Sequence, residues 1–137
     1  MDVLERAIRF EELDAAGIVF FGRYASYLHE AIEHFFAPLE GGYAGLFHER
    51  GIGMPIVRLE IDYQAPLRPT DGLRIETQVA HLGRRSTTFA FRVLRAASGE
   101  LAAMAKVTVV VVSVVQLLSC DMPRDVRALL EQHVARS

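Results

Sequence analysis

The sequence contains one cysteine, no tryptophan and almost no net charge, and each scarcity excludes a class of protein. Because Cys120 has no second cysteine to pair with, no disulfide can form within the chain, and we expect a reducing compartment, the cytoplasm. The 15 basic and 17 acidic residues give a formal charge of -2, whereas proteins that coat nucleic acids carry a strong basic excess. We therefore expect no nucleic-acid partner.

Long hydrophobic runs are also missing. The first nine residues include Asp2, Glu5, Arg6 and Arg9, so we expect no signal-peptide core there. The most apolar stretch, 107–118, has 12 residues, fewer than the roughly 18 that a membrane-spanning helix needs. Its many valines are instead typical of a long buried strand. We therefore expect no membrane segment.

The chain does contain enough apolar residues for one core. It has 137 residues, of which 51% are hydrophobic, a higher share than disordered chains carry. At this length, folding buries about two thirds of the surface of the extended chain. No linker, repeat or charge block divides the sequence, so we expect a single domain over residues 1–137.

The spacing of apolar residues predicts the order of elements. Helical spacing begins at Tyr24 and continues to Phe35, and Pro38 follows as a stop signal. Alternation with a period of two predicts strands in five ranges, which are 1–10, 57–64, 73–79, 87–93 and 107–118.

Short turns join the last four strands, so these must be antiparallel neighbours. Asp121 is expected to cap a C-terminal helix with Pro123 in its first turn. One long apolar helix and a curved antiparallel sheet must bury each other, which predicts an α+β domain of two layers.

Several catalytic motifs are excluded by spacing. His29 and His34 are five residues apart, whereas the zinc-protease helix needs histidines four apart, so we expect no metal site. The nucleophile elbow Gly-x-Ser-x-Gly and the phosphate-binding loop are absent from the sequence. No base is visible beside Cys120, which favours a structural role for this thiol.

What remains is the segment 14–24, in which a carboxylate and an apolar loop precede the long helix. Asp14 can simply satisfy the amides of a turn, as acidic residues often do. Against this, the helical pattern begins only near Tyr24, and a solvated turn does not normally carry an apolar loop. From the residues alone, a functional and a structural role for Asp14 are equally supported.

The pattern Asp14-x-x-Gly17-Ile18-Val19-x-x-x-x-Tyr24, followed by the residues Tyr-Leu-His-Glu-Ala at 27–31, resembles the 4-hydroxybenzoyl-CoA thioesterase family of hotdog folds. The YbgC-type acyl-CoA thioesterases belong to the same group. The resemblance covers nearly the whole chain and implies a hotdog fold, with a long central helix wrapped by a five-stranded antiparallel sheet, plus a C-terminal helix. It also implies a hydrolase that converts an acyl- or aroyl-CoA thioester to the free acid and CoA.

The resemblance implies roles for three residues in catalysis. A thiolate with a conjugate-acid pKa near 8.5 leaves without a strong general acid, so a carboxylate and oxyanion donors suffice. Asp14 would attack the carbonyl or activate a water, and both possibilities stay open. The backbone amides of Phe21 and Gly22, at the start of the helix, would stabilise the oxyanion.

The resemblance also implies a substrate-binding set. It consists of Gly17, Ile18, Val19, Tyr24, Arg84 and Arg85. Arginine forks suit the phosphates of coenzyme A, although Arg84 and Arg85 can equally be ordinary exposed turn residues. Coenzyme A is part of the substrate, so no separate cofactor is expected. The alternatives are a thioesterase for acyl carrier protein, or a non-catalytic protein that binds acyl thioesters.

We also expect a homodimer or homotetramer with sites shared between chains. The strands contain little proline, and 107–118 carries almost no charge, so little would blunt an exposed edge. In addition, alternation places valines on both faces of the last strand, so both faces would need cover. One face would carry Val107, Val109, Val111 and Val115, and the other Val110, Val112 and Val114.

Overall fold

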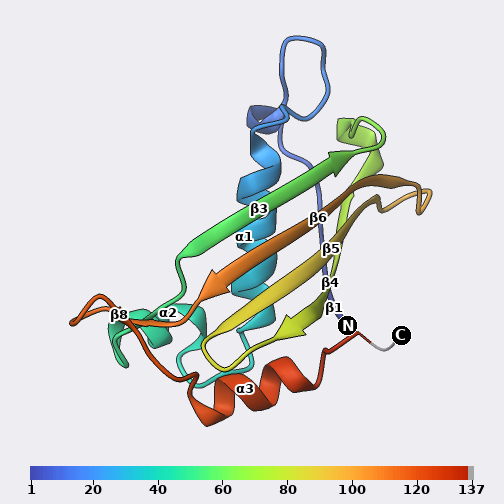
Figure 1. Cartoon of the computed structure of the whole chain (residues 1–137). Coiled ribbons are helices and arrows are strands. Elements are labelled where there is room, and N and C mark those ends of the chain that lie inside the picture. Colours follow the sequence, from blue (N-terminus) through green and yellow to red (C-terminus); the bar gives the residue numbers. More distant parts are fainter. Residues whose placement is uncertain (136–137) are drawn as a thin grey trace.

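The computed structural model describes residues 1–135, and its central feature is a curved five-stranded antiparallel sheet around one long helix (Figure 1). The sheet has the order β1-β4-β5-β6-β3. Its elements are β1 (Asp2–Arg6), β3 (Ile56–Tyr63), β4 (Leu73–Leu82), β5 (Ser86–Arg95) and β6 (Leu101–Val110), and the long helix is α1 (Arg23–Phe35). The shorter elements are η1 (Phe10–Glu12), α2 (Gly42–His48), β2 (Ile52–Gly53), η2 (Pro69–Asp71), β7 (Val112–Ser113), β8 (Leu118–Ser119) and α3 (Arg124–Glu131). This confirms the predicted fold class.

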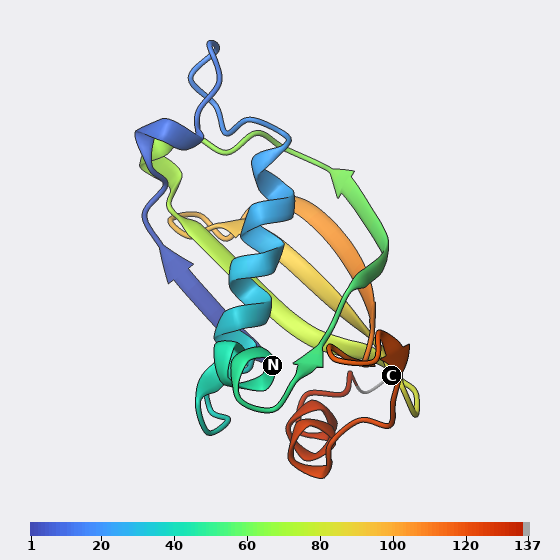
Figure 2. The ribbon, with the colours of Figure 1, turned by 90° about the vertical axis from the view of Figure 1, so that its left-hand side faces the viewer.

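The apolar stripe of α1 explains why the helix lies in the concave face of the sheet (Figure 2). Six of its side chains are buried, namely Tyr24, Tyr27, Leu28, Ala31, Ile32 and Phe35. The ring of Phe35 lies 5.4 Å from that of Phe89 on β5, in an edge-to-face arrangement. The helix ends at Phe35, just before Pro38, as predicted. Within residues 1–135, no helix is both long and apolar enough to cross a membrane.

The prediction of one strand over residues 107–118 is wrong. Strand β6 starts earlier, at Leu101, and ends at Val110. The chain then bends, and 112–119 forms a hairpin that pairs with β2 in a separate three-stranded sheet. Polar groups inside the apolar run close the turn, because the Ser113 hydroxyl accepts the Gln116 amide and the Ser113 carbonyl accepts the Leu117 amide. Hydrophobicity alone does not reveal such a turn.

The prediction of two apolar sheet faces is also wrong. Val107 and Val109 point into the core, and Val110 shares the opposite face of β6 with the polar Lys106 and Thr108. Val112 was expected on that face too, but it belongs to the separate sheet. An unpaired strand edge is present on β3, which has only β6 as a neighbour within residues 1–135. Large apolar side chains on β3 are about half exposed, namely Ile56, Val57, Leu59 and Tyr63.

Asp121 does not cap the C-terminal helix, contrary to expectation. Helix α3 starts at Arg124, its N-cap is Pro123, and no side chain caps it. Asp121 lies too early in the chain and instead binds the guanidinium groups of Arg84 and Arg85. The buried face of α3 is apolar, as predicted, with Val126, Leu129 and Leu130.

Candidate functional site

Asp14 lies on a loop that projects beyond the N-terminal end of α1 (Figures 1 and 2). The loop is a narrow hairpin, because Leu13 bridges to Val19 and the Asp14 amide donates to the Ile18 carbonyl at 2.8 Å. Gly17 has a φ of +80° in this loop, a conformation that glycine adopts without strain. The small-residue turn therefore gives the Asp14 loop its shape.

The Asp14 carboxylate uses one oxygen within its own loop. Oδ1 accepts the amides of Ala16 at 2.8 Å and Ile18 at 3.4 Å. Oδ2 has no hydrogen-bond partner within residues 1–135, and the residue is half-buried. The turn-stabilising role is therefore real, and it leaves one carboxylate oxygen available to react.

The start of α1 supplies two free backbone donors. Helix α1 begins at Arg23 after its N-cap Gly22, and the amides of Phe21 and Gly22 donate to no acceptor within residues 1–135. A Cβ on Gly22 would lie 2.5 Å from Cε2 of Phe20, so glycine lets the Phe20 ring lie close to the backbone here. An oxyanion donor has to be free and is favoured at a helix N-terminus, and both amides meet these two conditions.

A buried ion network lies at the base of the Asp14 loop. Glu12 is 5% exposed, and its carboxylate accepts hydrogen bonds from Arg6, the Arg9 amide and the Tyr27 hydroxyl. Burial alone would raise the pKa of Glu12, but these donors outweigh it and lower the pKa to about 2. Arg6 also binds Glu30 on α1, at 2.8 Å. No periodicity of apolar residues indicated this network, because its members come from β1, η1 and α1.

The predicted substrate-binding residues near Asp14 fall into two groups. Val19 and Tyr24 are 5% and 3% exposed and belong to the core, whereas Gly17 and Ile18 reach the surface. Burial raises the pKa of Tyr24 to about 12, so its hydroxyl stays protonated at neutral pH. Tyr63, which the sequence analysis did not single out, donates its hydroxyl to the Phe21 carbonyl at 3.0 Å.

Arg84 and Arg85 lie at the opposite end of the sheet from Asp14. They form the turn between β4 and β5, near α3, whereas the Asp14 loop extends from the other end (Figure 1). Asp121 lies between them, 2.8 Å from Nε of Arg85 and 3.2 Å from Nε of Arg84. Hydrogen bonds from the two arginines lower the pKa of Asp121. A single chain therefore does not bring the two predicted parts of the site together.

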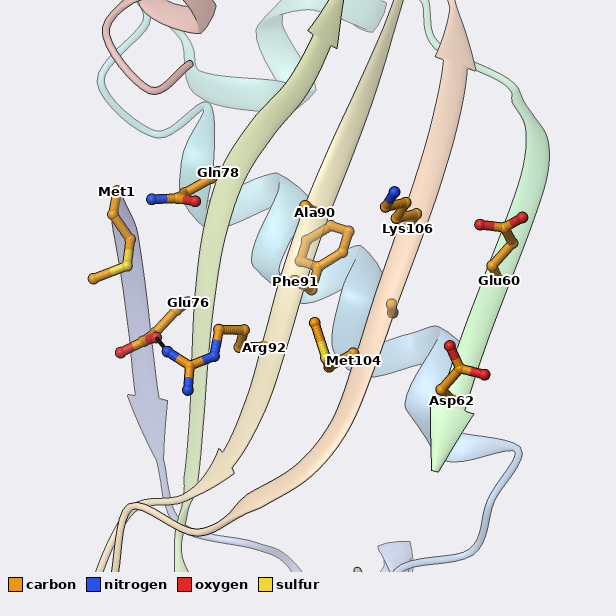
Figure 3. A pocket seen from close by; sticks show the side chains of 11 residues that line it. Met1, Glu60, Asp62, Glu76, Gln78, Ala90, Phe91, Arg92, Met104 and Lys106 are labelled. Atoms are coloured by element: carbon orange, nitrogen blue, oxygen red, sulfur yellow. Dashed lines mark hydrogen bonds and ion pairs between the residues drawn. The ribbon is translucent and has the colours of Figure 1, made fainter. Parts of the chain in front are cut away.

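A shallow depression of about 380 Å³ lies on the sheet face that points away from α1 (Figure 3). Charged side chains of both signs line it, among them Glu60, Glu76, Arg92 and Lys106. Arg92 binds Glu76 at 3.1 Å, so part of this charge is already neutralised. The depression contains none of the predicted site residues.

The helix histidines do not form a metal site. His29 contacts Glu33 at 3.0 Å and His34 contacts Asp2 at 2.8 Å, so each has a different partner. Within residues 1–135, no three His, Cys, Asp or Glu side chains lie close enough to hold a metal ion.

Residues 8–130 match the model of the thioesterase-like superfamily. A 1,4-dihydroxy-2-naphthoyl-CoA hydrolase from Synechococcus elongatus is 46% identical over 81 residues, which cover 58% of this chain and 60% of that protein. The chain thus spans less than two thirds of that relative's length.

Two solved structures share the fold at higher coverage. A thioesterase-superfamily protein from Jannaschia sp. CCS1 has a TM-score of 0.90 and 28% identity, covering 98% of this chain and 94% of that one. A gentisyl-coenzyme A thioesterase has a TM-score of 0.81 and 29% identity, covering 92% of this chain and 99% of that one. With the family model matching most of its length, the chain belongs to the thioesterase-like superfamily, whose members share the hotdog fold.

Proposed function

We propose that the protein hydrolyses an aromatic acyl-CoA thioester to the free acid and CoA. The observation that carries the proposal is the Asp14 loop, in which one carboxylate oxygen is open and two free amides follow at the start of α1. The names of the relatives support an aromatic acyl group, since one acts on a dihydroxynaphthoyl-CoA and another on a gentisyl-CoA.

The chemistry needs only the groups that this loop supplies. Asp14 attacks the thioester carbonyl, or removes a proton from a water that attacks it. The carbonyl oxygen gains negative charge, and the Phe21 and Gly22 amides stabilise that charge by donating to it. The C–S bond then breaks, and CoA leaves as a thiolate that takes up a proton from solvent. If Asp14 attacks directly, water subsequently hydrolyses the acyl anhydride.

We further propose that the functional unit is at least a dimer, paired through β3. The free edge of β3 and its half-exposed apolar side chains favour pairing with a second copy. In an antiparallel, two-fold pairing, the Ile56 end of one β3 lies beside the Tyr63 end of the other. The Arg84–Arg85 turn of one chain then approaches the Asp14 loop of its partner, which accounts for their separation within one chain.

A panel of thioesters with detection of the released thiol tests this function. The panel contains dihydroxynaphthoyl-CoA, gentisyl-CoA, a long aliphatic acyl-CoA and an aroyl group on acyl carrier protein. We expect the highest kcat/KM with the aromatic CoA thioesters. Faster turnover of the carrier-bound substrate would shift the assignment to a carrier-protein thioesterase. Binding without thiol release from any substrate would contradict hydrolysis.

A further inference from the structure

We propose that Glu12 is a positioning residue that holds the Asp14 loop in place against α1 through Tyr27 and Arg6. This inference rests on the proposed function, because positioning matters only if Asp14 reacts. Glu12 itself lies below the loop and is not proposed to touch the substrate.

Four donors bind the Glu12 carboxylate, three on Oε1 and one on Oε2. Arg6 donates Nη1 at 3.1 Å and Nη2 at 2.6 Å, the Tyr27 hydroxyl lies at 3.0 Å, and the Arg9 amide lies at 2.9 Å. A buried carboxylate whose donors come from β1, the following turn and α1 has little freedom to move. Both of its oxygens accept hydrogen bonds, whereas Oδ2 of Asp14 accepts none within residues 1–135.

The Glu12 backbone closes the loop that carries the predicted catalytic groups. Its carbonyl accepts the Phe20 amide at 2.9 Å. Asp14 lies two residues after Glu12 on one arm of the loop, and Phe21 lies directly after Phe20 on the other arm. A displacement of Glu12 therefore moves the carboxylate and the oxyanion donors relative to each other.

Arg6 and Tyr27 connect this closure to the helix. Arg6 Nε and Nη2 bind the two oxygens of Glu30 at 2.9 and 2.8 Å, and the Arg6 guanidinium lies 5.1 Å from the centre of the Tyr27 ring. Tyr27 and Glu30 are both on α1, whose N-terminus provides the free amides. The network thus holds the Asp14 loop in a fixed position relative to the N-terminus of α1, where the oxyanion donors lie.

Tyr27→Phe is the sharpest test, because it removes one hydroxyl from the network and leaves the buried ring. Misplacement of reacting groups by about 1 Å can cost up to roughly 100-fold in rate. We expect kcat to fall about tenfold with an aromatic CoA thioester and KM to stay unchanged. Glu12→Gln, which also removes the charge, should lower kcat further.

Tyr43→Phe is the matched control. Tyr43 is half-buried on α2, and its hydroxyl has no hydrogen-bond partner within residues 1–135. We expect this variant to keep the kcat and KM of the unmodified protein. It reports the effect of removing a tyrosine hydroxyl far from the Asp14 loop.

Hydrogen exchange of the loop gives a readout that does not need activity. The Phe20 amide, which donates to Glu12, should exchange faster in Tyr27→Phe than in Tyr43→Phe. An unchanged kcat in Tyr27→Phe, or a raised KM with unchanged kcat, would overturn the positioning role. The proposed function would still be tested separately by Asp14→Asn. Unchanged exchange of the Phe20 amide would also overturn it. Failure of the unmodified protein to release thiol would instead remove the proposed function, and the positioning role of Glu12 with it.

Discussion

At the scale of single residues, two acids two positions apart have opposite environments. Glu12 is buried and satisfied by four donors, whereas Asp14 is half-buried and keeps one oxygen open. The run Glu-Glu-Leu-Asp does not show which acid is buried. The environment of Glu12 depends on Arg6 and Tyr27, which lie elsewhere in the sequence. The family resemblance selected Asp14, but nothing in the local pattern indicated the role of Glu12.

Glu12→Gln should change how stability depends on pH. The pKa of Glu12 falls from its ordinary value of 4.5 to about 2 in the folded protein. A lowered pKa contributes stability that is complete above pH 4.5 and is lost as pH falls towards 2, and linkage gives about 3 kcal/mol for this shift. Urea unfolding should show that the deficit of the variant is largest at pH 7 and shrinks between pH 4.5 and 2.

Glu11→Gln is the control for this pH series. Glu11 is exposed, and its side chain makes no hydrogen bond or ion pair within residues 1–135. The unfolding free energy of Glu11→Gln should equal that of the unmodified protein at every pH. A deficit for Glu12→Gln that stays constant from pH 7 to pH 2 would contradict the ionised network.

At the scale of elements, sequence periodicity correctly predicted the helix and the strands whose form depends only on which side chains are buried. The buried stripe of α1 and the alternation of β4 and β5 follow directly from which side chains face the core. The prediction failed for 107–118 because valines fill both the end of β6 and the separate hairpin, so the apolar pattern continues across the break at Val111. The break lies where the backbone changes partners, because Val112 pairs with Gly53 on β2 and the Val111 carbonyl accepts the Cys120 amide.

The β4–β5 turn gives a prediction about substrate affinity. Asp121 binds Arg84 and Arg85, so a phosphate would have to compete with its carboxylate for these two arginines. If these arginines bind CoA, Asp121→Asn should lower KM for a CoA thioester about two- to fivefold, the size expected for exposed ion pairs. KM for a carrier-bound substrate, which lacks the nucleotide phosphates, should not change.

Asp125→Asn controls for a general change of charge. Asp125 binds Arg50 at 2.7 and 2.8 Å, and the variant removes the same charge close by in the sequence. It should leave KM unchanged. Equal KM values for Asp121→Asn and the unmodified protein would indicate that Arg84 and Arg85 are ordinary exposed turn residues.

At the scale of the whole molecule, the separation of Asp14 from Arg84 and Arg85 favours a site shared between chains. An unpaired edge was expected on the valine-rich range 107–118, but β6 lies inside the sheet and the free edge belongs to β3, which also carries Arg58, Glu60 and Asp62. The outer face of β6 is mixed, because Val110 shares it with Lys106 and Thr108 and the chain leaves the sheet before Val112. Light scattering at micromolar concentration should give a mass of at least twice 15.3 kDa.

Mixing two impaired chains tests the shared site directly. One chain carries Asp14→Asn, and the other carries Arg84→Ala with Arg85→Ala. After unfolding and refolding together in equal amounts, half of the dimers are mixed and contain one intact site, so about a quarter of the original activity should return below KM. Recovery no greater than the average of the two separate variants would place Asp14 and the arginines in the same chain's site.

The measurement that tests the central claim most directly is the turnover of Asp14→Asn with an aromatic CoA thioester. The amide keeps the size of the side chain and can still accept the Ala16 amide, so the loop should keep its shape. It cannot act as an anionic nucleophile or as a strong base. We predict that the variant binds substrate with unchanged affinity and releases thiol at least 100-fold more slowly. Turnover equal to that of the unmodified protein would contradict the account.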